Sequence, residues 1–171
     1  MTNTERARRV KLLVMDVDGT LTDGAMYYSE RGEELKRFST RDGMGITLLH
    51  RAAIQTAIIT SEHSPIVVRR AEKLRIHEVM LGSKDKTTTL LDMARRLNLE
   101  PEDIAYIGDD VNDLHVMKLC GLSACPADAL EIIRETAHLV CQRLGGNGAV
   151  RELAEFILVA QDKPITLPEQ W

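Results

Sequence analysis

The chain has 171 residues, a formal net charge of −4 and an aromatic content of only 4%. No stripe of basic residues is present, so we expect no nucleic-acid partner, and no apolar segment is long enough to cross a bilayer, so we expect no membrane partner. This length favours one domain that covers residues 1–171.

The predicted elements alternate between strands and helices along the chain. The basic run from Arg6 to Lys11 comes first, and we interpret it as a solvated flank. Apolar runs predict six strands: Val10–Met15, Gln55–Thr60, Glu78–Leu81, Ile104–Ile107, Leu122–Cys125 and His138–Cys141. Helices are predicted between and after them: Ile66–Leu74 behind Ser64-Pro65, Lys86–Leu97, a helix opened by an Asp128–Glu131 capping pair and ending near Thr136, and Gly148–Ala160. Near-continuous apolar strands separated by helices predict an α/β fold: a three-layer, Rossmann-like, doubly wound parallel sheet.

One segment departs from this alternation. Ala25–Ser29 and Glu34–Ser39 flank a short turn that contains Gly32, which predicts a small β-hairpin directly after the first strand. The hairpin is too small to be a cap domain. The last segment, residues 161–171, is predicted to be irregular or to dock elsewhere on the protein.

The three cysteines indicate the cellular compartment in which we expect the protein. Cys120, Cys125 and Cys141 are odd in number, lack CxxC spacing and lie in apolar runs. We therefore expect buried, reduced thiols and a cytoplasmic protein.

Acidic and polar residues follow four of the predicted strands. Ligands of open α/β sheets bind beyond the carboxyl ends of the strands, so these residues are expected to share one edge. They are Asp16, Asp18, Thr60, Lys86, Asp109, Asp110 and Asp113. Carboxylates a few ångströms apart repel by about 1 kcal/mol per pair in water and by more near protein. Any one of these acids could be a turn former or helix cap, but together they predict a Mg²⁺ site, because this ion prefers oxygen ligands.

The motifs DVDGT, IIT, KDK and GDDVND, in this order between Leu12 and Asp113, resemble those of haloacid-dehalogenase-like phosphotransferases. The resemblance implies that Asp16 becomes phosphorylated and that Asp18 acts as general acid and then base. It also implies that Thr60 bonds the phosphoryl oxygens and that Lys86 neutralises charge. Mg²⁺ would be held by Asp16, the main-chain carbonyl of Asp18 and Asp109, while Asp110 and Asp113 orient Lys86 or waters.

Three further segments, TDGAMYY, GEELKRFSTRDGMGI and GGNGAVREL, resemble a capless subgroup of this family. Members of the subgroup hydrolyse 2-keto-3-deoxy sugar acid phosphates, either 3-deoxy-manno-octulosonate 8-phosphate or 2-keto-3-deoxynononate 9-phosphate. The resemblance implies a homotetramer whose hairpins pack together and whose subunits close one another's sites. The glycine-rich turn at residues 145–148 could bind an anion or could be a plain connection.

An anionic sugar acid phosphate requires cations at both ends. Arg41 is the first candidate for substrate contact, and Lys36 is among the other available cations. Octulosonate phosphatases usually have T-G-R after the second strand, whereas this chain has Thr60-Ser61-Glu62. Glu62 together with Lys73 resembles the nononate-phosphate members, so the nine-carbon substrate is slightly favoured; Glu62 could also be only a helix-start acid.

Two alternatives remain at this stage. A catalytically silent assembly module would have lost the acidic motifs, which are intact here. A receiver-like phospho-acceptor domain would carry its acceptor after a mid-chain strand, whereas Asp16 follows the first strand.

Overall fold

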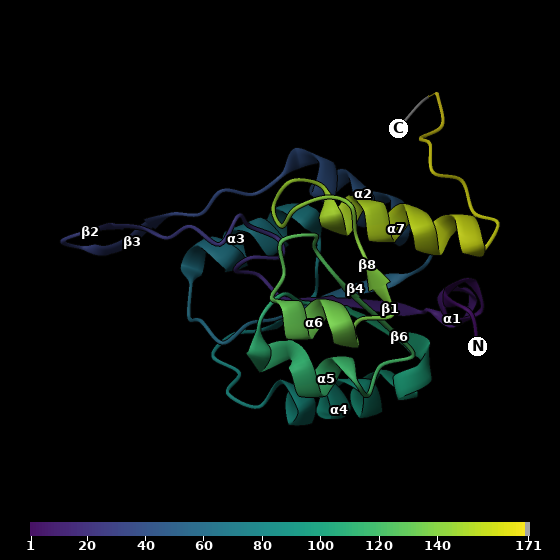
Figure 1. The fold of residues 1–171 in the computed structure, drawn as a ribbon. Helices are drawn as coiled ribbons and strands as arrows, with labels where there is room; N and C mark the ends of the chain where they lie inside the picture. Colours follow the sequence, from purple (N-terminus) through teal and green to yellow (C-terminus); the bar gives the residue numbers. More distant parts are fainter. Residues whose placement is uncertain (170–171) are drawn as a thin grey trace.

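Six parallel strands form the central sheet of the computed structural model, which describes residues 1–169 (Figure 1). They are β1 (Leu12–Met15), β4 (Gln55–Ile59), β5 (Glu78–Met80), β6 (Ile104–Ile107), β7 (Leu122–Cys125) and β8 (Leu139–Val140), in the spatial order β5-β4-β1-β6-β7-β8. The chain builds outward from β1 to β5 and then returns to the other side of β1 with β6. A topological switch point therefore lies at the carboxyl ends of β1 and its neighbours, where such sheets bind ligands.

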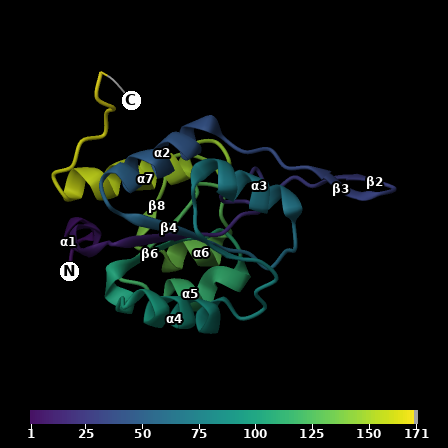
Figure 2. The ribbon, with the colours of Figure 1, turned by 180° about the vertical axis from the view of Figure 1, so that it is seen from behind.

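Helices cover both faces of this sheet, as the predicted three-layer fold requires (Figures 1 and 2). One layer contains α1 (Asn3–Arg9), α2 (Thr40–Arg51), α3 (Pro65–Leu74) and α7 (Ala149–Ala160). The other contains α4 (Lys86–Leu97), α5 (Leu114–Met117) and α6 (Glu131–Thr136). Within β1, Leu13 and Met15 face the first layer and Leu12 and Val14 the second, all without exposure. This burial on both faces explains the continuous apolar runs of the sequence.

The predicted hairpin is present and projects from the body of the protein (Figure 2). It consists of β2 (Tyr27–Ser29) and β3 (Gly32–Leu35), which pair antiparallel. Gly32 has a φ of +111°, in the left-handed region that the turn requires and that glycine adopts without strain. Among residues 1–169 nothing larger than this hairpin covers the carboxyl edge of the sheet.

Three α-helices were not predicted: α1, α2 and the short α5. The basic flank forms helix α1, begun by a capping box between Thr2 and Glu5, and its Arg8, Arg9 and Lys11 are exposed, as expected of a solvated flank. Helix α2 contains Gly43 and Gly45, which lower helix propensity. Gly45 allows α7 to approach closely, because a methyl group there would lie 3.0 Å from the Cα atom of Arg151 on α7.

One predicted helix cap is wrong, and a second makes a different bond from the one a cap makes. Helix α6 begins at Glu131 with Leu130 as its N-cap, while the carboxylate of Asp128 accepts a hydrogen bond from the backbone of Gly145. Ser64 is the N-cap residue of α3 and Pro65 its first residue, as predicted, but the hydroxyl of Ser64 makes no cap bond and donates to Glu33 on β3. In both cases a long-range partner takes the group that the local pattern assigned to a cap.

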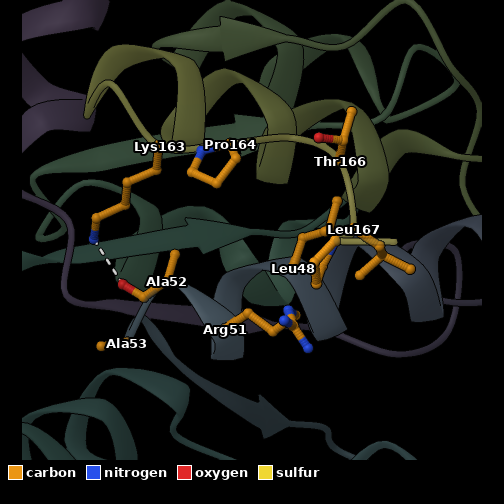
Figure 3. A pocket seen from close by; sticks show the side chains of 9 residues that line it. Leu48, Arg51, Ala52, Ala53, Lys163, Pro164, Thr166 and Leu167 are labelled. Carbon is orange, nitrogen blue, oxygen red and sulfur yellow. Dashed lines mark hydrogen bonds between the residues drawn. The ribbon is translucent and has the colours of Figure 1, made fainter. Parts of the chain in front are cut away.

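The segment after α7 docks on the end of α2 (Figure 3). Lys163 donates a 2.7 Å hydrogen bond to the carbonyl of Ala52, and Leu167 packs against the core. These residues line a cavity of about 650 Å³. The predicted irregular tail continues to Gln170 and Trp171, which lie outside the described residues. No helix in the described range is long and apolar enough to cross a membrane.

Candidate active site

The ends of β1 and β6 bring two aspartates together. The strands pair in parallel with Met15 opposite Ile107, and the backbone N–H of Asp16 donates to the carbonyl of Ile107. Asp109 follows two residues after Ile107, so its side chain and that of Asp16 meet at the switch point. One carboxylate oxygen from each of Asp16, Asp109 and Asp113 lies within 4.8 Å of the other two.

Lys86 is held between two of these carboxylates. It is the first residue of α4, and its Nζ atom donates to Asp16 Oδ1 at 2.6 Å and to Asp113 Oδ1 at 2.7 Å. Its side chain is only 2% exposed. Burial disfavours the charged ammonium, but the two carboxylates outweigh that cost and raise the pKa of Lys86. Lys86 therefore supplies a fixed positive charge beside Asp16.

Asp113 is fully buried and accepts hydrogen bonds from several groups of the site. Its Oδ1 also accepts from the hydroxyl of the buried Tyr106 at 2.6 Å, and its Oδ2 accepts from the backbone N–H groups of Asp109 at 3.0 Å and Asp110 at 3.3 Å. With four donors on two oxygens, Asp113 has little capacity left for a metal. Asp110 is exposed, and its side chain accepts from the backbone of Val111.

The remaining carboxylates are electrostatically strained. Burial, with the neighbouring Asp113 as the next cause, raises the pKa of Asp16 to about 8. Burial likewise raises the pKa of Asp109 to about 6. Thr20 donates to Asp109 Oδ1 at 2.9 Å, while a methyl group on Gly19 would meet Asp109 Oδ2 at 2.1 Å. A divalent cation fits here, because it would replace the protons that these raised pKa values otherwise favour.

Asp18 lies two residues beyond Asp16 and faces the hairpin. Its Oδ1 accepts a 2.5 Å hydrogen bond from Lys36, whereas its buried Oδ2 has no partner among the described residues. Lys36 also lies 2.6 Å from Glu33. Burial disfavours its charge, but hydrogen bonds to Asp18 and Glu33 raise the pKa of Lys36. The sequence suggested Lys36 as a possible substrate cation; the structure buries its side chain in these ion pairs instead.

Thr60 is buried at the end of β4, which pairs with β1 on the side opposite β6. Its hydroxyl accepts from the backbone of Glu62 at 3.2 Å, and its own carbonyl accepts from Ser83. These bonds connect the loops after β4 and β5 and fix Thr60 at the edge that carries Asp16.

The three residues predicted to bind substrate lie outside this cluster. Arg41 is exposed in the first turn of α2 and lines a polar groove of about 580 Å³ with residues of the 142–155 segment. Glu62 is exposed on the loop after β4. Lys73 is exposed in the last turn of α3, about 12 Å along the helix from Pro65. Among the described residues, none of these three side chains makes a hydrogen bond or ion pair with the acidic cluster.

The glycine-rich turn before α7 has a packing role. A methyl group on Gly145 would meet the carbonyl oxygen of Gly19 at 1.8 Å, and the backbone N–H of Gly146 donates to the carbonyl of Thr20. The turn therefore supports the loop that carries Asp18. The sequence did not reveal this contact, nor the roles of Tyr106 and Thr20 in holding Asp113 and Asp109.

Comparison with protein families matches residues 53–153 to the model described as haloacid dehalogenase-like hydrolase. The chain is similar to 3-deoxy-D-manno-octulosonate 8-phosphate phosphatase KdsC of Yersinia pestis, with 43% identity over 159 residues, or 93% of this chain and 85% of that protein.

Solved structures agree in fold. The crystal structure of the Yersinia pestis phosphatase has a TM-score of 0.92 at 43% identity, covering 94% of this chain and 86% of that chain. The 3-deoxy-D-manno-octulosonate 8-phosphate phosphatase of Moraxella catarrhalis, solved in complex with a magnesium ion, a phosphate ion and KDO, has a TM-score of 0.91 at 39% identity, covering 94% and 92%.

Proposed function

Because the chain belongs to the haloacid dehalogenase-like hydrolases, we propose that it is a Mg²⁺-dependent phosphatase that acts on 3-deoxy-D-manno-octulosonate 8-phosphate. The observation that carries the proposal is the pair Asp16 and Asp109 at the switch point, with Lys86 2.6 Å from Asp16. The intact acids argue against a silent assembly module, and the family assignment leaves no support for a receiver-like domain.

In this proposal Asp16 is the nucleophile. A carboxylate oxygen of Asp16 forms a bond to phosphorus while the bond from phosphorus to the sugar oxygen breaks. Asp18 gives a proton to the leaving alkoxide, and then accepts one from the water that attacks the aspartyl-phosphate. Release of phosphate restores Asp16. Thr60 donates its hydroxyl hydrogen to a phosphoryl oxygen, and Lys86 offsets the charge that Asp16 and the phosphate share.

Asp16, Asp109 and the main-chain carbonyl of Asp18 are the proposed Mg²⁺ ligands. The ion would neutralise phosphate charge and lower the repulsion between the two carboxylates. The donor set supports this assignment, because Asp113 is already occupied by four donors and Asp16 and Asp109 are not. Asp113 is proposed to orient Lys86. Asp110 makes no contact with Lys86, so for it we retain only a role in ordering the loop after β6.

For the substrate we choose the eight-carbon sugar acid. The similar phosphatases reported above are named for that substrate, and the slight preference for the nine-carbon acid that Glu62 and Lys73 suggested has no support from them. Arg41, Glu62 and Lys73 remain proposed substrate contacts. Glu62 lies two residues after Thr60, at the edge of its own chain's site, whereas for Arg41 and Lys73 we propose contact with the substrate of a neighbouring subunit.

We accordingly propose a homotetramer. The hairpin supports this proposal, since Tyr27, Tyr28 and Leu35 are 45%, 65% and 62% exposed on a projecting element. Light scattering on the purified protein tests it. A monomer that is fully active at nanomolar dilution would contradict shared sites. The cytoplasmic location stays a prediction, with which the three free, buried cysteines agree.

The direct test of the proposed function is phosphate release from 3-deoxy-D-manno-octulosonate 8-phosphate. We expect turnover with Mg²⁺, none in excess chelator, and recovery when Mg²⁺ is restored. The variant Asp16→Asn should fold and bind the substrate but release no phosphate. Turnover that persists in excess chelator, or in the Asp16→Asn variant, would refute the proposal.

A further inference from the structure

Lys36 is the one residue of the hairpin segment that reaches a catalytic carboxylate in the described chain. It directly follows β3, and its side chain has no exposed surface. Its Nζ atom lies 2.5 Å from Asp18 Oδ1 and 2.6 Å from Glu33 Oε1. An ammonium group without access to water depends on these two carboxylates, so its position is fixed by them.

The contact treats the two oxygens of Asp18 differently. Oδ1 is held by Lys36, whereas Oδ2 is buried and has no hydrogen-bond partner among residues 1–169. An isolated carboxylate can rotate and exchange its oxygens, but a charge-assisted bond to one oxygen restrains that rotation. Oδ2 is then the oxygen that carries no hydrogen bond and is left free to hold the proton.

Lys36 is itself anchored from a second direction. Glu33 Oε2 accepts a 2.5 Å hydrogen bond from the hydroxyl of Ser64, the N-cap residue of α3. Lys36 and Glu33 belong to the hairpin segment, Ser64 to the loop after β4, and Asp18 to the loop after β1. The chain Ser64–Glu33–Lys36–Asp18 thus connects three segments of the rim.

We propose that Lys36 is a positioning residue that holds Asp18 Oδ1, so that Oδ2 faces the leaving oxygen of the phosphate ester. The inference rests on the proposed function, because it assumes that Asp18 transfers the proton. It gives the hairpin a role within its own subunit: the hairpin supplies the cation that orients the general acid. Well-placed acid–base groups contribute about 10²–10⁴-fold to rates, and a misplaced one loses much of that factor.

The test compares two leaving groups in rapid-quench experiments. Cleavage of the sugar phosphate requires a proton for its alkoxide. The second substrate, dinitrophenyl phosphate, releases dinitrophenolate, which leaves without a proton. The measured rate is that of the first step, the transfer of the phosphoryl group to Asp16. For Lys36→Met we expect this rate to fall about 100-fold with the sugar phosphate and less than about threefold with dinitrophenyl phosphate, where the burst of dinitrophenolate measures it. Lys36→Arg keeps the charge and should recover part of the loss. A general disturbance of the fold would slow both substrates equally, and this result would overturn the proposal.

Two further variants complete the design. If Lys36→Met does not fold, Glu33→Gln weakens the anchor of Lys36 and should produce the same selective loss, about three- to tenfold; equal rates on both substrates would overturn the proposal. Arg31→Met removes a positive charge from the 86% exposed side chain at the hairpin turn and should leave both rates unchanged. Persistence of the burst in Asp16→Asn would instead contradict the proposed function itself.

Discussion

The Nζ atom of Lys86 lies 2.6 Å from the carboxylate of Asp16, and both side chains are almost fully buried. In the metal-free protein, truncating the lysine would leave Asp16 and Asp113 facing each other without a cation. We therefore expect Lys86→Met to lower the free energy of unfolding by about 3–5 kcal/mol, since breaking a buried ion pair leaves an uncompensated charge. The kcat value should fall about 10²–10³-fold.

Denaturant unfolding and steady-state kinetics check this expectation. Lys118→Met, at an exposed position after α5, is the matched control and should change the unfolding free energy by less than about 0.5 kcal/mol. A Lys86→Met variant with wild-type kcat would show that this charge is dispensable.

The stabilisation by Mg²⁺ should depend on pH. Without metal, the pKa of Asp16 is raised from 3.8 to about 8 and that of Asp109 from 3.8 to about 6, chiefly by burial. A raised folded-state pKa gives stability that is complete below the unfolded value and is lost as pH rises, here between about pH 4 and 8. Mg²⁺ binds the deprotonated carboxylates and restores the stability that the rise in pH removes.

We accordingly expect the increase in Tm on adding Mg²⁺ to grow from about pH 5 to pH 8. Thermal unfolding with and without Mg²⁺ across this range measures it. In Asp109→Asn the increase should be smaller throughout. An equal increase in Tm at every pH would argue against Asp16 and Asp109 as the ligands.

The contact between Gly145 and Gly19 predicts a substitution that acts on the site from a distance. Gly145→Ala would place a methyl group 1.8 Å from a backbone oxygen, so the loop that carries Asp18 has to move. We expect a loss of about 1–3 kcal/mol in unfolding free energy together with a reduced kcat.

The control for Gly145→Ala is Leu144→Ala, the preceding position, where the side chain is 48% exposed. It should be close to wild type in both measurements. Full stability and activity in Gly145→Ala would mean that the Asp18 loop does not depend on this packing.

Substrate length can be tested at Glu62. If this exposed side chain bonds a sugar hydroxyl, Glu62→Arg should shift the ratio of kcat/KM between the nine- and eight-carbon phosphates by about tenfold toward the eight-carbon acid, as expected for loss of one hydrogen bond to a charged group. Glu135→Arg, exposed on α6 in the other helix layer, is the control. An unchanged ratio would leave Glu62 as a helix-start acid.

The sequence predicts the carboxylates of this site well, because Asp16 and Asp109 lie within two residues of the ends of apolar strands, and parallel strands present their carboxyl ends at one edge. The sequence does not predict contacts between segments that are distant along the chain and are brought together by the fold. The pairing of Lys36 with Asp18 requires the path of the hairpin, and the bond from Gly145 to Asp128 joins residues that the local pattern assigned to a turn and a cap.

Helix α2 shows a second reason why the sequence did not predict part of the fold. Gly43 and Gly45 weaken the local helical preference, and α7, which lies close to Gly45, provides the packing that stabilises the helix. Local propensity alone could not predict this element.

The central claim is that Asp16 carries the phosphoryl group during turnover. Its most direct test is acid quenching of the protein during turnover, borohydride reduction and mass spectrometry of the peptide that contains Asp16. The account predicts that Asp16 is converted to homoserine in the wild-type protein turning over substrate, and that no such product forms without substrate. A phosphoryl group on another residue, or steady turnover with Asp16 never modified, would contradict it.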